Sequence, residues 1–91
     1  MQKIEKEIVI RNSQGLHARP AALFVQTAAK FDSSVQIDKD GDVVDGKSIM
    51  GILSLGAESG TKIVLIIDGD DAQEALAELE KILIKDLDRS K

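Results

Sequence analysis

The chain has 91 residues, enough for one hydrophobic core but too few for two, so a partner must bind at its surface or in a shallow site. Hydrophobic residues make up 43% and charged residues 31%, a balance typical of a folded globular domain and not of a disordered or membrane-spanning one. A formal net charge of −4 and an aromatic content of 2% argue against nucleic acid as a partner, because nucleic-acid-binding surfaces are usually basic and often carry stacking rings.

The first part of the chain predicts a strand, a loop and a helix. Residues 1–7 lack the apolar run of a signal peptide and no later stretch reaches membrane-spanning length, so we expect a cytoplasmic protein without membrane insertion. Isoleucine and valine residues within 4–10 predict a strand that ends in the turn-rich segment 12–15. Across 18–31, apolar residues fall three and four apart, which predicts an amphipathic helix. Pro20 lies in its first turn, where a proline sacrifices no hydrogen bond.

The rest of the chain predicts a hairpin, a short helix, a strand and a second long helix. Residues 35–44 alternate in polarity around Asp40-Gly41, a strong signal for a hairpin turn. The apolar segment 48–56 begins with a serine suited to an N-cap and ends with a glycine, which predicts a short helix. A run rich in β-branched residues, 62–67, predicts a strand buried on at least one face. Residues 72–83 carry an apolar stripe with acidic residues before it and lysines towards its end, as expected for a helix.

This order of elements is βαββαβα, in which the helices can all cover one face of an antiparallel sheet. We therefore predict the α+β class and an open-faced β-sandwich, with a four-stranded antiparallel sheet and three helices on one face. Residues 1–91 are expected to form a single domain, with 88–91 as a loose tail. No internal repeat or low-complexity tract suggests another architecture.

The only histidine, His17, lies where a glycine-containing loop meets the helix that Pro20 opens. Backbone N–H groups and the helix dipole make the start of a helix attractive to phosphate, and Arg19 can add a charge-assisted hydrogen bond. The same positive helix end disfavours the imidazolium form, so we expect His17 to be more often neutral, the form with a nucleophilic nitrogen. The segment thus combines a nucleophile with a cradle for an anion.

Other roles for His17 have weaker support. A lone histidine in an arbitrary domain is more often a surface residue beside a helix cap. A metal site is disfavoured because the chain has no second histidine and no cysteine, and its carboxylates are scattered, so we expect neither a metal nor a cofactor. A serine-hydrolase triad is also disfavoured, because nothing around Ser13 or Ser33 supplies a nucleophile elbow or an oxyanion hole.

Two separate motifs resemble those of one family. Residues 15–22, Gly-Leu-His-Ala-Arg-Pro-Ala-Ala, resemble the active-site signature of the HPr phosphocarrier family, and residues 47–56 resemble its regulatory-serine segment. The resemblance covers nearly the whole chain and implies a carrier, not an enzyme. Phosphorylated enzyme I, whose own donor is phosphoenolpyruvate, would phosphorylate His17 on Nδ1, and the group would pass to enzyme II A components of a sugar phosphotransferase system. Arg19 matches the arginine that steadies the phosphoryl group, and Pro20 the proline that fixes the helix start.

Ser48 precedes the short predicted helix and has two expected roles. A serine in this position is typically an N-cap. The resemblance also implies phosphorylation of Ser48 by an HPr kinase/phosphorylase, and a phosphate at a helix start is electrostatically tolerated. The added charge would act at the partner surface, where it can repel an acidic docking face and slow the loading of His17.

Apolar side chains of the helix segments nearest His17 can form a docking patch for partners. The docking patch is expected to comprise Ala18, Ala22, Leu23, Ile49, Met50 and Leu53. Exposed apolar residues beside a reactive group commonly mark a partner site, and a methionine adapts to several partners. The alternative is ordinary core packing, which we expect to claim Ile52 and Leu55.

Two other functions stay open from the sequence. A regulatory paralogue that serves a nitrogen-related relay or a dihydroxyacetone kinase would share the His17 motif, although the Ser48 segment favours the sugar-system carrier. A small-ligand sensor on a similar sandwich would bind an anion at His17 without reacting with it. A transient carrier works most simply as a monomer, which is the oligomeric state we expect.

Overall fold

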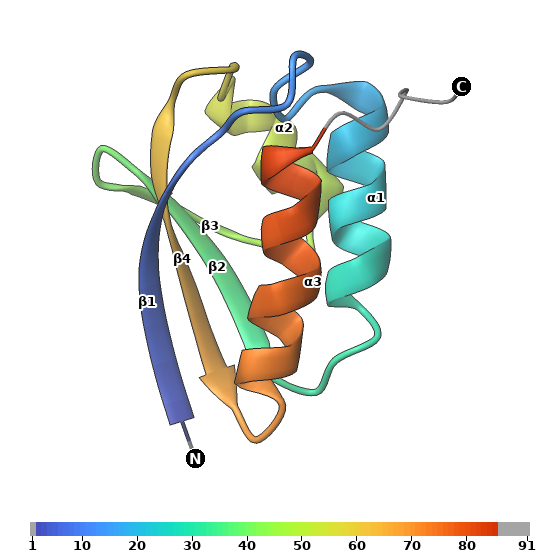
Figure 1. Ribbon diagram of the computed structural model, residues 1–91, viewed down its shortest axis with the longest axis vertical. Coiled ribbons are helices and arrows are strands. Elements are labelled where there is room, and N and C mark those ends of the chain that lie inside the picture. Colours follow the sequence, from blue (N-terminus) through green and yellow to red (C-terminus); the bar gives the residue numbers. More distant parts are fainter. Residues whose placement is uncertain (1, 86–91) are drawn as a thin grey trace.

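In the computed structural model, which describes residues 2–85, the strands and helices follow the predicted order βαββαβα. They are β1 (Gln2–Val9), α1 (Ala18–Ala28), β2 (Ser34–Lys39), β3 (Asp42–Asp45), α2 (Ile49–Leu55), β4 (Lys62–Gly69) and α3 (Ala72–Ile84). The strands lie in the order β1-β4-β2-β3, every neighbouring pair is antiparallel, and α1, α2 and α3 cover the same face of the sheet (Figure 1). The predicted α+β open-faced sandwich is confirmed. The expected tail, 88–91, lies outside the described residues.

The turn between β2 and β3 has the backbone conformation that its sequence predicts. Asp40 and Gly41 adopt positive φ angles of 53° and 94°, as the two central residues of a type I′ hairpin turn require. The Asp38 carboxylate accepts a hydrogen bond from the backbone N–H of Gly41 at 2.9 Å, which supports the turn. The resulting register pairs Ile37 with Val44, so that both strands present an apolar side chain to the core.

Helix α1 ends at Ala28, earlier than the predicted end at Phe31. The backbone N–H groups of Lys30 and Phe31 donate to the carbonyls of Thr27 at 3.1 Å and of Ala28 at 3.2 Å, so the chain tightens into turns that span three residues. Phe31 still packs, partly buried, against the core. The apolar spacing therefore continues beyond the helix because Phe31 reaches the core from the turn.

The loop after α1 is held by Asp71, the residue immediately before α3. The Asp71 carboxylate accepts hydrogen bonds from the backbone N–H groups of Asp32 at 2.9 Å and Ser33 at 3.0 Å, and from the Ser33 hydroxyl. The Ser33 hydroxyl, followed by the Asp32 N–H, lowers the pKa of Asp71 below its usual 3.8, because these donors favour the ionised carboxylate. This carboxylate makes no capping hydrogen bond to α3 and instead joins two distant loops.

The core lies between the sheet and the helices and is largely aliphatic, as the composition predicts. Side chains alternate along β4, with Ile63, Leu65 and Ile67 buried on the helix side. Phe24 of α1 is also completely buried. The predicted apolar stripe of α3 faces the core: Leu76 is partly buried, and the buried members are Ala72, Ala75, Leu79, Ile82 and Leu83. None of the helices in the described part of the chain is long and apolar enough to cross a membrane.

Candidate functional site

The loop that precedes His17 is fixed by a close approach of two backbone segments. Gly15 has a φ angle of +67°, and a Cβ atom there would lie 2.7 Å from Cα of Glu58 and 2.8 Å from the carbonyl oxygen of Ala57. Only glycine fits such a contact without displacing the neighbouring backbone. Leu16 is fully buried, and its backbone N–H donates to the Ala57 carbonyl at 2.8 Å. His17 therefore directly follows a residue that is anchored in the core.

Asn12 fixes the other end of this loop, a role that was not predicted from the sequence. The side-chain amide of Asn12 donates to the carbonyl of Ile82 at 2.8 Å, and its backbone N–H donates to the carbonyl of Leu83 at 3.2 Å. Both carbonyls belong to the last turn of α3, where they have no partner within the helix. Among residues 2–85, the Oδ1 atom of Asn12 is buried without a hydrogen-bond partner. The sequence hints at this role only by placing an asparagine in a turn-rich loop. Nothing in the sequence of α3 identifies the carbonyls of Ile82 and Leu83 as its partners.

His17 is exposed and occupies the N-cap position of α1, at the junction that the sequence predicts. Its backbone is extended, with φ −106° and ψ −171°, and its carbonyl accepts a helical hydrogen bond from the N–H of Ala21 at 2.8 Å. The imidazole makes no capping hydrogen bond to the described helix, in contrast to the usual N-cap side chain. The ring is therefore not committed to the backbone and can be reached by a partner.

Arg19 and Pro20 lie in the first turn of α1, one exposed and the other buried. Pro20 has no N–H, and the N–H of Ala21 is bonded to His17. The first N–H groups of a helix have no acceptor within the helix, so a helix start of this kind favours an anion. The guanidinium of Arg19 carries further hydrogen-bond donors on the same helical turn.

The docking patch lies on α1 and α2, which pack against each other. Its members are exposed to different degrees: Met50 is 74% exposed, Leu23, Ile49 and Leu53 are also exposed, as is Ala18, and Ala22 is partly buried. Ile52 and Leu55 are buried in the core, as predicted. The exposed apolar members thus belong to two helices in contact, and His17 is the N-cap of one of them.

Ser48 is the N-cap of α2, as predicted, and is partly exposed. Its Oγ atom accepts a hydrogen bond from the backbone N–H of Gly51 at 3.1 Å. The Lys47 ammonium donates to the carbonyl of Phe31 at 2.8 Å, so this lysine holds the chain beside Ser48 against the loop after α1. At the other end, Gly56 adopts a φ angle of 60° and ends the helix in the left-handed conformation.

The site as a whole has one exposed imidazole, one guanidinium and a helix start, beside an apolar surface. Within residues 2–85, no three histidine, cysteine, aspartate or glutamate side chains gather in a way that could hold a metal ion. A group can be accepted here from one partner and presented to another, because the accepting side chain is exposed. An exposed imidazole of this kind suits a small protein that carries a group between partners.

Comparison with known proteins defines this class further. Residues 4–85 match the family model described as PTS HPr component phosphorylation site. The HPr-like protein Crh of Bacillus subtilis (strain 168) is 50% identical over 76 residues, which cover 84% of this chain and 89% of Crh. The crystal structure of the phosphocarrier protein HPr of Bacillus anthracis str. Ames is 44% identical, with a TM-score of 0.86 and coverage of 89% of this chain and 96% of that chain.

A crystal structure of the Bacillus subtilis catabolite repression containing protein Crh is 47% identical, with a TM-score of 0.72 over 92% of this chain and 97% of that chain. That protein is described as an intertwined dimer formed by a swapping domain. With the family model matched over most of its length, the chain belongs to the HPr family. Proteins of this family carry phosphoryl groups in the phosphotransferase system and are not enzymes.

Proposed function

We propose that this protein accepts a phosphoryl group on Nδ1 of His17 from phosphorylated enzyme I and donates it to enzyme II A components of a sugar phosphotransferase system in the cytoplasm. The observation that carries the proposal is the exposed imidazole at the N-cap of α1, which makes no capping hydrogen bond to the helix. A carrier needs its acceptor atom within reach of two different active sites in turn. An N-cap ring that is held by a rigid loop but not bound to the backbone meets that need.

Transfer at His17 is a displacement at phosphorus. The lone pair of the neutral imidazole nitrogen forms the new N–P bond, the bond from phosphorus to the donor breaks, and the donor keeps that electron pair. The group moves on by the reverse step when an acceptor of the next protein attacks the phosphorus. Little beyond alignment and charge neutralisation is required of a carrier, and a partner can supply part of both.

Arg19 and the N–H groups of the first turn of α1 are proposed to neutralise the charge on the phosphoryl oxygens. Arg19 is exposed in the first turn beside His17, and charge-assisted hydrogen bonds from a guanidinium are roughly twice as strong as neutral ones. Pro20 is proposed to fix the start of the helix, since its ring sets φ near the helical value and its missing N–H costs nothing there. Neither residue needs to transfer a proton.

The proposal is tested by incubating the protein with phosphoenolpyruvate and an active enzyme I, followed by intact mass and acid-lability analysis. We expect one acid-labile phosphate on the wild type and none on a folded His17→Ala variant. An unmodified wild type, in the presence of an enzyme I proven on another carrier, would exclude this role and favour a sensor that binds an anion without reacting. Transfer from the phosphorylated protein to an enzyme II A domain completes the test.

Ser48 is proposed to regulate this cycle through phosphorylation by an HPr kinase/phosphorylase. Its Oγ is partly exposed at the start of α2, on the side of the docking patch, so a phosphate there would place negative charge where partners approach His17. We expect enzyme I to phosphorylate Ser48→Asp more slowly than Ser48→Thr, which keeps the hydroxyl and the cap. Equal rates for the two variants would remove this regulatory role.

A role in catabolite repression that depends on Ser48 alone is the second candidate, and the description of the Bacillus subtilis relative Crh favours it. The two functions separate in one experiment, because a regulator of this kind would take phosphate from the kinase on Ser48 and none from enzyme I on His17. We propose a monomer for the carrier. Light scattering on a size-exclusion column distinguishes it from a swapped dimer like that described for Crh.

A further inference from the structure

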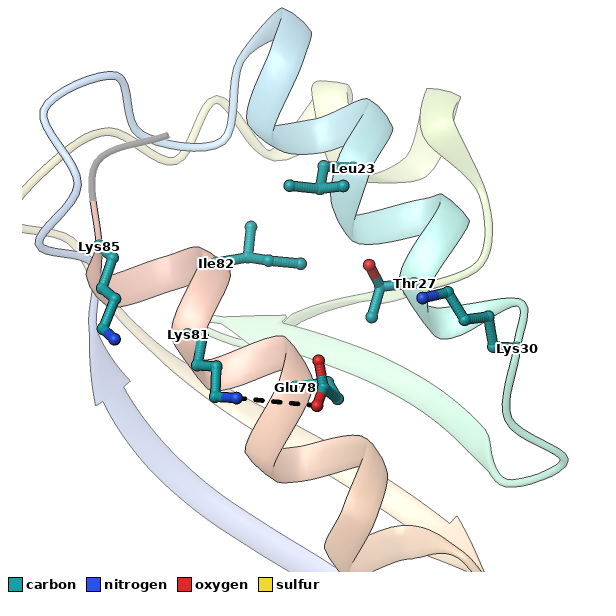
Figure 2. Close-up of a pocket in the computed structure, with 7 residues that line it drawn as sticks. All are labelled: Leu23, Thr27, Lys30, Glu78, Lys81, Ile82 and Lys85. Atoms are coloured by element: carbon teal, nitrogen blue, oxygen red, sulfur yellow. Dashed lines mark ion pairs between the residues drawn. The ribbon is translucent and has the colours of Figure 1, made fainter. Parts of the chain in front are cut away.

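A groove between α1 and α3 lies beside the docking patch but has no part in the chemistry of His17. It has a volume of about 440 Å³ and runs between the two helices, with side chains from both pointing into it (Figure 2). Its floor is formed by Leu23 and Thr27 of α1 and by Ile82 of α3. Ile82 and Thr27 are each only 6% exposed, whereas Leu23 is 37% exposed, so Leu23 provides most of the apolar surface that a ligand can cover.

The rim of the groove is positively charged, in a chain whose net charge is −4. Lys30 lies just beyond the end of α1, and Lys81 and Lys85 lie at the end of α3. One carboxylate, that of Glu78, lies on this rim and is 3.7 Å from the Lys81 ammonium. Both side chains of that pair are more than half exposed, so the pair holds Lys81 only weakly. Lys30 and Lys85 have no ion-pair partner within residues 2–85.

The groove is continuous with the surface around His17. A smaller hollow of about 310 Å³ is lined by Arg19, Ala22, Leu23 and Gln26, all of α1. Leu23 therefore lines both depressions and also belongs to the docking patch. A partner that reaches Arg19 at the start of α1 can follow this helix along Ala22 and Leu23 into the groove without leaving the surface.

We propose that the α1–α3 groove binds a segment of a partner protein in which one apolar side chain is flanked by carboxylates. The apolar side chain covers Leu23, and the carboxylates pair with the lysines of the rim. The identity of the partner rests on the proposed function. The partner is a protein that exchanges a phosphoryl group with His17 and contacts α1 both at the docking patch and in the groove. Charge complementarity and continuity with the docking patch carry the inference.

The lysines have another physical role that the test must separate from docking. Cations near the C-terminal end of a helix stabilise it through the helix dipole, and Lys81 lies in the last turn of α3. If that were their only role, replacing them would lower the melting temperature and leave partner binding unchanged. A docking role instead changes binding at a temperature where every variant is folded.

The first experiment is an NMR titration of the full-length protein with the capped peptide Asp-Glu-Leu-Asp-Glu. We expect saturable shifts in the amide signals of Thr27, Lys30 and Ile82, and binding about tenfold weaker for the triple variant Lys30→Gln, Lys81→Gln, Lys85→Gln. The uncharged peptide Asn-Gln-Leu-Asn-Gln is expected to bind at least as weakly. Lys62→Gln, which removes an exposed lysine from the first position of β4, is the matched control and should bind as the wild type does.

The second experiment measures phosphoryl transfer between His17 and enzyme I, and between His17 and an enzyme II A domain. In at least one direction, the triple variant should raise KM severalfold and leave kcat unchanged. Equal peptide affinity in the triple variant, or shifts confined to Met50 and its neighbours, would overturn the proposal. It would also be overturned if the groove lysines bound anionic phospholipid vesicles but not the peptide. If enzyme I did not phosphorylate His17 in the wild type, the carrier function would be refuted but the groove proposal would not, since peptide binding is measured without phosphoryl transfer.

Discussion

The side-chain amide of Asn12 lies 2.8 Å from the carbonyl oxygen of Ile82, and this hydrogen bond ties the loop before His17 to the last turn of α3. The backbone N–H of Arg11 adds a second link, to the carbonyl of Leu83 at 2.9 Å. The position of the imidazole thus depends on a helix that lies at the other end of the chain. Damage to this link should affect both the stability of the fold and the function at His17.

Replacement of Asn12 by alanine should lower the free energy of unfolding by about 1–3 kcal/mol, because a buried carbonyl loses its donor. Phosphorylation of His17 by enzyme I should slow as well, since only the backbone N–H groups of Arg11 and Asn12 then hold this end of the loop to α3. Urea denaturation and transfer rates measure the two effects. Asn12→Asp gives a more specific test, because it preserves the shape of the side chain but places a carboxylate against backbone carbonyls. It should be no more stable than Asn12→Ala, and a more stable Asn12→Asp would contradict the described contact.

A comparison of Gly15 with Gly56 isolates the energetic effect of the close backbone contact at Gly15, in the loop before His17. Their φ angles are similar, +67° and +60°, but a Cβ atom at Gly15 would lie 2.7 Å from Cα of Glu58, whereas one at Gly56 would meet nothing within 4 Å. Gly56→Ala should therefore cost only the left-handed conformation, about 1 kcal/mol. Gly15→Ala should cost about 1–3 kcal/mol more, because the backbone must shift. Equal losses in chemical denaturation would contradict the packing argument.

The parts of the fold that could be predicted from the sequence are those determined by neighbouring residues. The hairpin turn at Asp40-Gly41 follows from two residues that tolerate positive φ, and the limits of α2 follow from Ser48 and Gly56. The placement of His17 at a helix start follows in the same way from the proline in its first turn. In each case the physical cause lies within about one helical turn of the residue concerned.

The features that were not predicted depend on contacts between distant segments. The partner of Asn12 is Ile82, and the carboxylate of Asp71 binds the backbone of Asp32 and Ser33. Neither pair leaves a periodic or local pattern in the sequence. The early end of α1 was also not predicted, because Phe31 reaches the core from the turn after Ala28 and so continues the apolar spacing beyond the helix. The groove between α1 and α3 likewise exists only once the two helices are packed side by side.

Asp71 gives a pH dependence whose sign follows from its lowered pKa. The hydrogen bonds from Ser33 and Asp32 favour the carboxylate in the folded state, so the contribution to stability is complete above the usual pKa of 3.8 and is lost as the pH falls through the lower folded value. Asp71→Asn should therefore be less stable than the wild type at pH 7, and the difference should shrink below pH 4. Chemical denaturation at both pH values measures it. The control is Asp70→Asn, which replaces the adjacent exposed carboxylate and should retain the pH dependence seen in the wild type. If the stability difference between Asp71→Asn and the wild type did not change with pH, the assignment to Asp71 would be contradicted.

Ser48 offers a test that separates its structural role from its proposed regulatory one. Ser48→Ala removes the acceptor for the N–H of Gly51 and should cost about 1 kcal/mol of unfolding free energy, whereas Ser48→Asp keeps an acceptor and should remain close to the wild type in stability. Ser54→Ala, which removes an exposed hydroxyl from the same helix, controls for serine loss and should have a smaller effect. Because Ser48→Asp is predicted to be stable but slow with enzyme I, and Ser48→Ala less stable but not slow, the two variants should rank in opposite orders for stability and transfer rate. The same ranking in both measurements would mean that Ser48 affects His17 only through the fold.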